Sequence, residues 1–127
     1  MSGEISVISN ERRITVSPED SASRWGNPGV EVLSTPAILG HVERLCADLL
    51  QPRLAPGEVT VGVRVVMNHR APARVGDVVV IEATAAGDGS QPQFDFAVRS
   101  VEGGVLCDGV HQRAVVDADR FRARISA

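Results

Sequence analysis

One stretch of this chain, residues 36–51, constrains the fold most, because its apolar residues recur at the spacing of an amphipathic helix. Thr35 is expected to be the N-cap, Pro36 suits the first helical position, and Pro52 ends the helix. The apolar positions are Ile38, Val42, Leu45, Cys46, Leu49 and Leu50. A single helix cannot bury such a face by itself, so the rest of the chain must supply a second layer.

That second layer is predicted to be an antiparallel sheet. A short strand is expected before the helix, at residues 13–17 (RITVS), and four strand-like segments follow the helix, at residues 58–69, 78–86, 93–101 and 105–116. The turn signals GDGSQP and EGG separate the last three segments, which favours a meander. The chain is therefore predicted to be α+β, with one central helix on a five-stranded antiparallel sheet. A small barrel with a helical plug fits the same pattern.

The length of 127 residues predicts a single domain over residues 1–127. Within it, residues 1–10 are expected to form a loose or edge-pairing arm. Residues 18–34 are too irregular for a helix and contain the only tryptophan, Trp25. Because loops of this length in compact domains are usually functional or mobile, this loop is expected to cover a site.

Composition excludes several classes of protein. The net charge of −3 gives no electrostatic footprint for nucleic acid. The first residues contain no apolar core of a signal peptide, and no apolar run approaches the roughly 20 residues that span a bilayer. Cys46 and Cys107 are far apart and form no metal-binding or disulfide pattern, which is typical of reduced thiols in a cytoplasmic protein. No metal site is expected.

Two polar residues fall where apolar ones are expected. Glu43 lies on the apolar stripe of the helix, flanked by Leu39 and Cys46. His69 ends the inward face predicted for the strand 58–69, which contains Val59, Val61, Val63, Val65 and Met67. Structural roles are possible, namely a carboxylate that reaches solvent and a histidine bonded to backbone. The functional alternative is a general base or nucleophile at Glu43 and a proton carrier at His69.

Thr35 adds a hydroxyl at the helix start, where N–H groups favour negative charge. It either only caps the helix or serves as nucleophile or oxyanion stabiliser, with Ala37 and Ile38 as possible N–H donors. Thr35 and Glu43 are separated by about 12 Å along a straight helix. A substrate must therefore span them, or one of them comes from a second protomer, which predicts a homodimer with the site near its interface.

Four further residues are considered for the site. Gly62 interrupts a valine-rich strand, which indicates close approach of backbone or ligand, and its N–H is a candidate oxyanion donor. His111 and Arg113 share one face of the last strand with Cys107, Gly109 and Val115. That face is either a half-exposed edge, or Arg113 holds the acyl end of a substrate. His41 is assigned no role.

The stretch STPAILGHVERLCADLLQPRLAPGEVTVGVRVVMNH, followed by GVHQRAVVD, resembles the fluoroacetyl-CoA thioesterase-like branch of the hotdog-fold thioesterases. The resemblance covers roughly residues 28–125 and includes the spacing Thr-x7-Glu-x25-His. It implies a hotdog dimer and a catalytic triad of Thr35, Glu43 and His69. It also places Gly62 in the site and Arg113 at the acyl end of the pocket.

One part of the family pattern is missing. The fluoroacetyl-specific enzyme carries phenylalanines shortly before the threonine, as a lid over the acyl group. The corresponding stretch here is RWGNPGVEVLST, in which Trp25 is the one aromatic residue that could take this place. A broader or different short acyl group is therefore expected.

Together, the residues and the resemblance predict hydrolysis of an acyl-CoA or related thioester. No cofactor is expected beyond coenzyme A as part of the substrate. The expected partners are a small acyl thioester and further copies of the chain, as a homodimer or dimer of dimers, with no nucleic acid and no membrane. Two other functions remain open: a non-catalytic module that binds acyl-CoA or another metabolite, and a hotdog hydratase or dehydratase.

Overall fold

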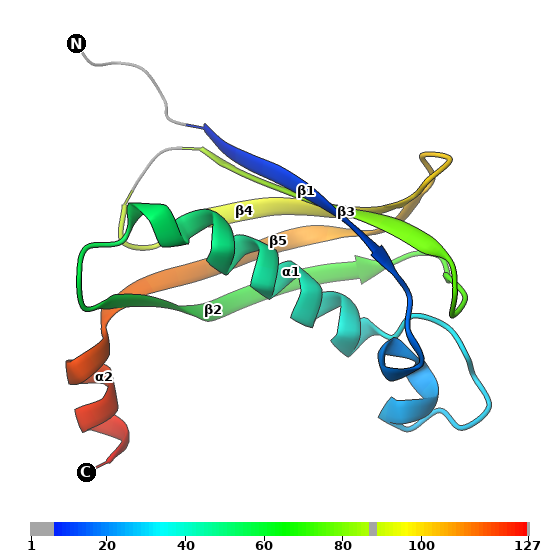
Figure 1. Ribbon diagram of the computed structural model, residues 1–127, viewed down its shortest axis with the longest axis horizontal. Helices are drawn as coiled ribbons and strands as arrows, with labels where there is room; N and C mark the ends of the chain where they lie inside the picture. The colour runs from blue at the N-terminus through cyan, green and yellow to red at the C-terminus, as the bar shows by residue number, and fades with distance from the viewer. Residues whose placement is uncertain (1–6, 87–88, 127) are drawn as a thin grey trace.

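The computed structural model describes residues 7–86 and 89–126, in which one long helix packs on one sheet (Figure 1). The sheet is antiparallel throughout, and its strand order is β1-β3-β4-β5-β2. The strands are Val7–Thr15 (β1), Glu58–His69 (β2), Val78–Ala86 (β3), Gln93–Ser100 (β4) and Val105–Asp117 (β5). The predicted architecture of one central helix on five antiparallel strands is confirmed.

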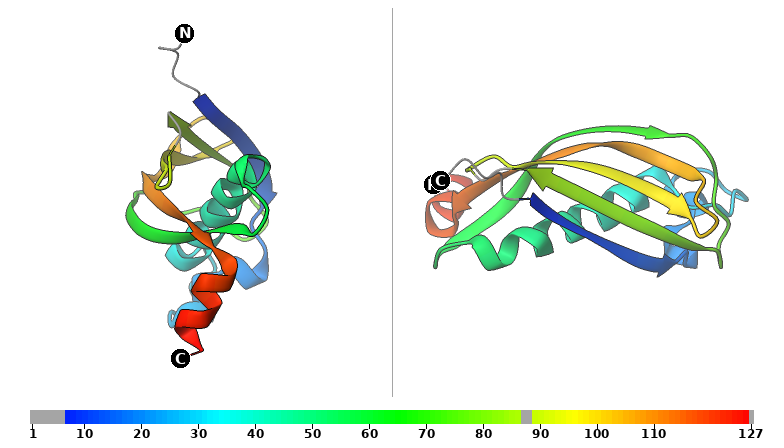
Figure 2. Two further views of the ribbon diagram at one scale, coloured as in Figure 1. Left: turned by 90° about the vertical axis from the view of Figure 1, so that its left-hand side faces the viewer. Right: turned by 90° about the horizontal axis from the view of Figure 1, so that it is seen from above.

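The core lies between the helix α1 and the concave face of the sheet, which arches over it (Figure 2). Every second residue of β3 and β4 points toward the helix. The buried side chains of these two strands are Val79, Ile81, Ala83, Ala85, Phe94, Phe96 and Val98. Full burial of one large apolar side chain contributes about 1.5–3 kcal/mol, so this interface holds the two layers together.

The helix α1 spans Thr35–Leu50, and its N-cap is Ser34. The Ser34 Oγ accepts a hydrogen bond from the Ala37 N–H at 3.2 Å. The expectation that Thr35 caps the helix is therefore wrong by one residue, since the chain offers two adjacent hydroxyls of similar capping preference. As a result, the Thr35 hydroxyl is available for another partner. The short 3₁₀-helix η3 (Gln51–Arg53) follows directly.

The edge strand β2 contains a β-bulge. It pairs with β5, and the register shifts between Gly62 and Arg64. Gly62 lies opposite Arg113, whereas Val65 lies opposite His111. The extra residue in β2 is therefore Val63.

The bulge reverses the alternation of side chains along β2, because an added residue moves all later side chains to the other face. Thr60 and Gly62 face α1 before the bulge, and Val65, Met67 and His69 face it afterwards. The predicted inward face is therefore wrong in part: Val59 and Val61 lie on the opposite face of the sheet.

Segments outside the core also differ from expectation. Residues 7–10 belong to the edge strand β1 and pair with β3, and residues 1–6 lie outside the described part. The segment 18–34 contains two short 3₁₀-helices, η1 (Pro18–Asp20) and η2 (Ala22–Trp25). A second helix, α2 (Ala118–Ile125), was not expected, and Asp117 caps it.

The close packing of β2 against β5 yields a first prediction. A Cβ atom added to Gly109 would overlap the backbone carbonyl of Val66, which has no room to move within the ladder. Gly109→Ala is therefore expected to lower the free energy of unfolding by about 2–3 kcal/mol, as other overpacked sites do. Chemical denaturation measures this change.

The matched control is Gly40→Ala, on the outer part of α1, where a Cβ meets no other atom within 4 Å. This control is expected to raise stability by up to about 1 kcal/mol, because alanine is the better helix former. If Gly109→Ala were as stable as the wild type, β2 and β5 would not pack as closely as described.

Candidate active site

Glu43 lies midway along α1, and its side chain is 42% exposed. Its carboxylate faces Gly62, where an added Cβ would be only 3.2 Å from Oε2. A cavity of about 250 Å³ opens at this point, lined by Glu43, Gly62, Val63, Arg64, Val65 and His111. The glycine therefore makes the room that the carboxylate needs between the helix and the edge of the sheet.

The charge that faces Glu43 is Arg113 on β5, whose side chain is only 7% exposed. Its Nη1 lies 3.4 Å from Glu43 Oε2. Its Nε donates to Thr60 Oγ1 at 3.0 Å, and its Nη2 donates to the Thr60 carbonyl at 2.9 Å. A buried guanidinium without such partners would be costly, so β2 and α1 together stabilise this charge.

His111 completes this group of polar residues. The ring is buried, with Nδ1 at 3.2 Å from the Arg64 carbonyl and Nε2 at 3.1 Å from Arg113 Nη1. Burial lowers the pKa of His111, and the nearby Arg113 charge acts in the same direction. Of the two alternatives raised by the sequence for His111 and Arg113, a half-exposed edge is wrong, because the structure buries both.

Thr35 and His69 form a second group. The Thr35 Oγ1 lies 2.8 Å from His69 Nδ1, and both side chains are exposed. A cavity of about 220 Å³ lies beside His69, lined by His69, Arg70, Ala71 and Pro72. The structure thus joins the first residue of α1 to the last residue of β2, which are 34 positions apart.

The two groups are separate within one chain. Glu43 lies two helical turns from Thr35, about 12 Å along the axis, and it contacts Arg113 instead of His69. Both groups lie along β2, which is an edge strand of the sheet. The three residues predicted as a triad therefore lie along one side of the fold, but only Thr35 and His69 are in contact.

The backbone donors proposed for an oxyanion differ in availability. The N–H groups of Ala37 and Ile38 are already bonded to Ser34. The Arg113 N–H donates to the Pro92 carbonyl at 3.0 Å, so Arg113 and its opposite residue Gly62 form a non-hydrogen-bonded pair. The Gly62 N–H consequently points away from β5, toward the free edge of β2.

The segment 18–34 lies at the N-terminal end of α1 (Figure 1). His41 Nε2 lies 3.0 Å from Asp20 Oδ1, which ties this segment to the helix. Burial raises the pKa of Asp20, but hydrogen bonds from Ser17 and His41 outweigh it and hold the pKa below its usual value. Trp25 ends η2 and is 57% exposed, and it lines neither of the two cavities described above.

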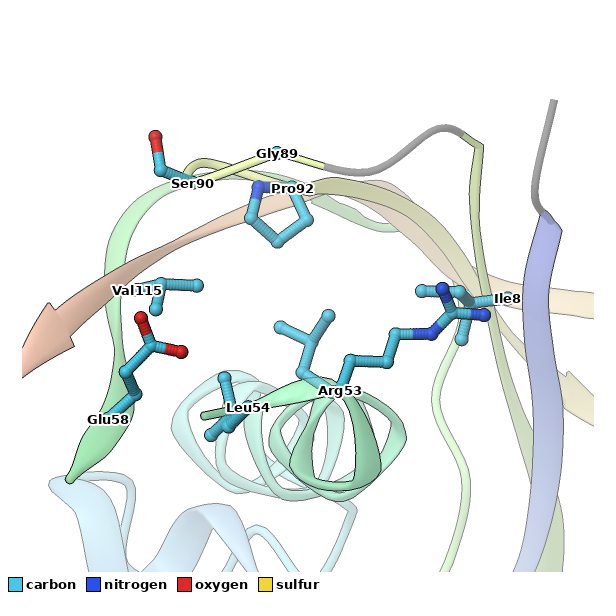
Figure 3. Close-up of a pocket in the computed structure, with 9 residues that line it drawn as sticks. Ile8, Arg53, Leu54, Glu58, Gly89, Ser90, Pro92 and Val115 are labelled. Carbon is cyan, nitrogen blue, oxygen red and sulfur yellow. The ribbon is translucent and has the colours of Figure 1, made fainter. Parts of the chain in front are cut away.

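A larger cavity, of about 340 Å³, lies at the other end of α1 (Figure 3). Its walls include Leu50, Leu54 and Val115, with Arg53 and Glu58 among the polar residues. None of the residues predicted for the site lines it. The larger cavity is therefore not the one beside Glu43 or the one beside His69.

Two contributors to the site were missed from the sequence. Thr60 is not considered for the site, because uninterrupted alternation with Val59 and Val61 inward leaves it on the outer face of β2. His111 was noted, but it was given no role. Its position two residues before Arg113 on the same strand face was the available signal.

Comparison with known proteins places the chain in a family. A family model described as fluoroacetyl-CoA-specific thioesterase matches residues 16–119. A fluoroacetyl-CoA thioesterase from Streptantibioticus cattleyicolor is 27% identical over 96 residues, which cover 75% of this chain and 68% of that protein.

Solved structures of similar fold include a hot-dog-like protein and a thioesterase. A hot-dog-like protein from Thermanaerovibrio acidaminovorans is 28% identical with a TM-score of 0.81, covering 93% of this chain and 89% of that one. The fluoroacetyl-CoA thioesterase FlK has a TM-score of 0.83 at 22% identity, covering 93% of this chain and 92% of that one.

The fold and the matched family together define a hotdog thioesterase, an enzyme that hydrolyses thioesters. The chain belongs to the fluoroacetyl-CoA-specific thioesterase family, whose match includes α1 and β2 to β5 in full. Within residues 7–86 and 89–126, no three His, Cys, Asp or Glu side chains gather as metal ligands. No helix in this same part of the chain is long and apolar enough to cross a bilayer.

The space at Gly62 yields a second prediction. A Cβ added there would lie 3.0 Å from the His111 ring and 3.2 Å from the Glu43 carboxylate, so Gly62→Ala must displace one of them. We expect kcat/KM for thioester hydrolysis to fall by about 10- to 100-fold, as small misplacements of reacting groups do. Stability is expected to fall by only about 1 kcal/mol.

Thiol release and chemical denaturation measure the two effects. Gly104→Ala, in the turn between β4 and β5, is the matched control, because its Cβ would make only an ordinary contact with Ser100. Full activity of Gly62→Ala would mean that the reaction does not depend on the present placement of the His111 ring and the Glu43 carboxylate.

Proposed function

We propose that the protein hydrolyses a short or small acyl thioester of coenzyme A, with Thr35, Glu43 and His69 in its site. The observation that carries the proposal is the position of the Glu43 carboxylate. It is partly exposed and lines a cavity, and one of its oxygens contacts the buried Arg113. A carboxylate in this position can act on a substrate in the cavity without leaving its partner. Membership of the thioesterase family supports this role.

The reaction adds water across the bond between the acyl carbon and sulfur. The water oxygen bonds to the acyl carbon, a tetrahedral oxyanion forms, and the carbon–sulfur bond breaks. Coenzyme A leaves as a thiol with one proton, and the acyl group leaves as a carboxylic acid. On this route Glu43 serves as general base. If Glu43 or Thr35 is instead the nucleophile, its oxygen bonds to the acyl carbon, coenzyme A leaves as the thiol, and water then cleaves the acyl-enzyme bond to release the acid. His69 carries the proton, and the Thr35 hydroxyl that it contacts serves as nucleophile or stabilises the oxyanion.

Two groups support stabilisation of the oxyanion. The Gly62 N–H points toward the free edge of β2 beside Glu43. The N-terminal end of α1 carries partial positive charge next to the Thr35 hydroxyl. Such donors typically lower the barrier of acyl transfer by about 3–4 kcal/mol each.

We infer that the working form is a homodimer, alone or as a dimer of dimers, with the site near the interface. The strand β2 is a free edge of twelve residues with exposed valines, among them Val63 and Val66. Native proteins rarely leave such an edge unpaired. Antiparallel pairing of two copies would carry His69 of one copy toward the Glu58 end of the other copy's strand, and so toward the half that holds Gly62 and Glu43.

The acyl group is proposed to be short, without strict selection for fluoroacetyl. The cavity beside Glu43 is small, about 250 Å³. Trp25 is the aromatic residue that precedes Thr35, and its exposed position in η2 does not place it over this cavity.

Cys46 and Cys107 are both buried free thiols, which supports the expected cytoplasmic location.

Release of thiol from a panel of acetyl-, fluoroacetyl-, propionyl- and hexanoyl-CoA tests the site. We expect Glu43→Gln and His69→Ala to lower kcat by about 100-fold or more, as loss of acid–base groups does. Thr35→Ala is expected to lower it as well, because its hydroxyl contacts the His69 ring.

His41→Ala is the control, since His41 contacts Asp20 on the other side of α1 and is expected to retain activity. If the three variants released coenzyme A as fast as the wild type, the assignment of the site would be wrong.

A charged substitution on the edge strand β2 tests the proposed dimer interface. Val63→Lys places a cation on the free edge and is expected to convert the dimer to monomer in sedimentation velocity, with loss of activity at low protein concentration. Val101→Lys is the matched control, because Val101 is equally exposed, at 52%, but lies in the turn after β4. A wild-type protein that is monomeric at every concentration and fully active would rule out the dimer.

A further inference from the structure

We propose that His111 is the positioning residue that fixes the Arg113 guanidinium and thereby keeps the Glu43 carboxylate available for the reaction. This inference rests on the proposed function of Glu43. It assigns a role to a side chain that is hydrogen-bonded to Arg64 and Arg113 and lines the cavity beside Glu43.

The partners of the ring determine its protonation. The Arg64 carbonyl only accepts hydrogen bonds, so His111 Nδ1 must carry a proton. The Arg113 guanidinium only donates, so His111 Nε2 must present its lone pair. Both contacts are satisfied only by the neutral ring protonated at Nδ1. A protonated Nε2 would set one N–H against another inside the fold.

The bulge in β2 creates the first of these contacts. The register shift between Gly62 and Arg64 occurs where the ring packs against β2. Gly62 allows this approach, since a Cβ there would lie 3.0 Å from the Cε1 atom of the ring. The Arg64 carbonyl therefore holds the ring at Nδ1, and Nε2 on the other side of the ring accepts from Arg113.

In the second contact, between His111 Nε2 and Arg113 Nη1, the ring competes with Glu43 for one nitrogen of the guanidinium. Nη1 lies closer to His111 Nε2, at 3.1 Å, than to Glu43 Oε2, at 3.4 Å. Nε and Nη2 are both taken by Thr60. The guanidinium is thus held in the sheet by three contacts, and it meets the carboxylate through one long contact on a single oxygen.

Loss of the His111 Nε2 acceptor would change how Arg113 contacts Glu43. Without His111 Nε2, one N–H of Arg113 Nη1 loses its buried partner, and Glu43 Oε2 is the other acceptor that Nη1 already contacts. The guanidinium would move toward the carboxylate and form a closer ion pair with it. A carboxylate held in that way is misplaced for attack on a substrate in the cavity.

Two variants test the role of the acceptor. His111→Gln retains an amide oxygen that can accept from Arg113 and an amide N–H that can donate to the Arg64 carbonyl. His111→Leu has no acceptor and a similar apolar volume. We expect His111→Leu to lower kcat by about 10- to 100-fold with little change in KM, and His111→Gln to recover most of the loss. His41→Leu is the control on the opposite side of α1 and is expected to retain kcat.

A measurement on the unaltered protein makes the test independent of activity. Nitrogen-15 NMR of the imidazole at pH 7 is expected to show His111 with a protonated Nδ1 and an unprotonated Nε2. A protonated Nε2 or a charged ring would overturn the proposal, as would wild-type kcat in His111→Leu or a loss that His111→Gln does not reduce. If Glu43→Gln were fully active, the proposed function would fail, whereas the NMR result would still decide how the ring is bonded.

Discussion

Burial of α1 beneath the arched sheet brings one carboxylate, Glu43, against the sheet, and the polar part of the molecule is arranged around that charge. The apolar residues on either side of Glu43 must be buried for the two layers to join. The strand β5 places Arg113 against this carboxylate, and the guanidinium is the charge that needs a partner, since it is only 7% exposed while Glu43 is 42% exposed. Arg113 in turn needs acceptors, which Thr60 and His111 provide. Glu43, Thr60 and His111 together allow the Arg113 charge to be buried.

The layered fold could be predicted from the sequence because it depends on local patterns. Helical spacing placed α1 to within one residue at each end, and the bounds expected for β2 and β3 match those observed. The bulge at Val63 could not be predicted, because the argument from alternation assumes an uninterrupted ladder. Gly62 marked the position where the argument fails, but a glycine by itself does not state that an extra residue is present. The helix α2 was missed because its eight residues bury only Ala118.

The site could be predicted in part, for a related reason. Glu43 and His69 drew attention because each is polar at a position expected to be apolar, and this conclusion about His69 survives the bulge since the reversed alternation returns it to the inner face. The cap was assigned to Thr35 instead of Ser34, yet this error leaves the Thr35 hydroxyl available for its contact with His69. The burial of Arg113 and His111 depends on a helix 70 positions away from Arg113, which no local pattern reveals.

The free edge of β2 connects these observations to the way the protein works. Its inner face contributes Thr60 and Gly62 to one polar group and His69 to the other, and its backbone at Gly62 points away from β5. An isolated chain would leave this edge and its valines in water, which is costly. In the proposed dimer, the same pairing that covers the edge also brings the two separated polar groups of different copies toward each other. Assembly and catalysis would then depend on one strand, whose bulge follows Gly62 directly, close to the Glu43 carboxylate.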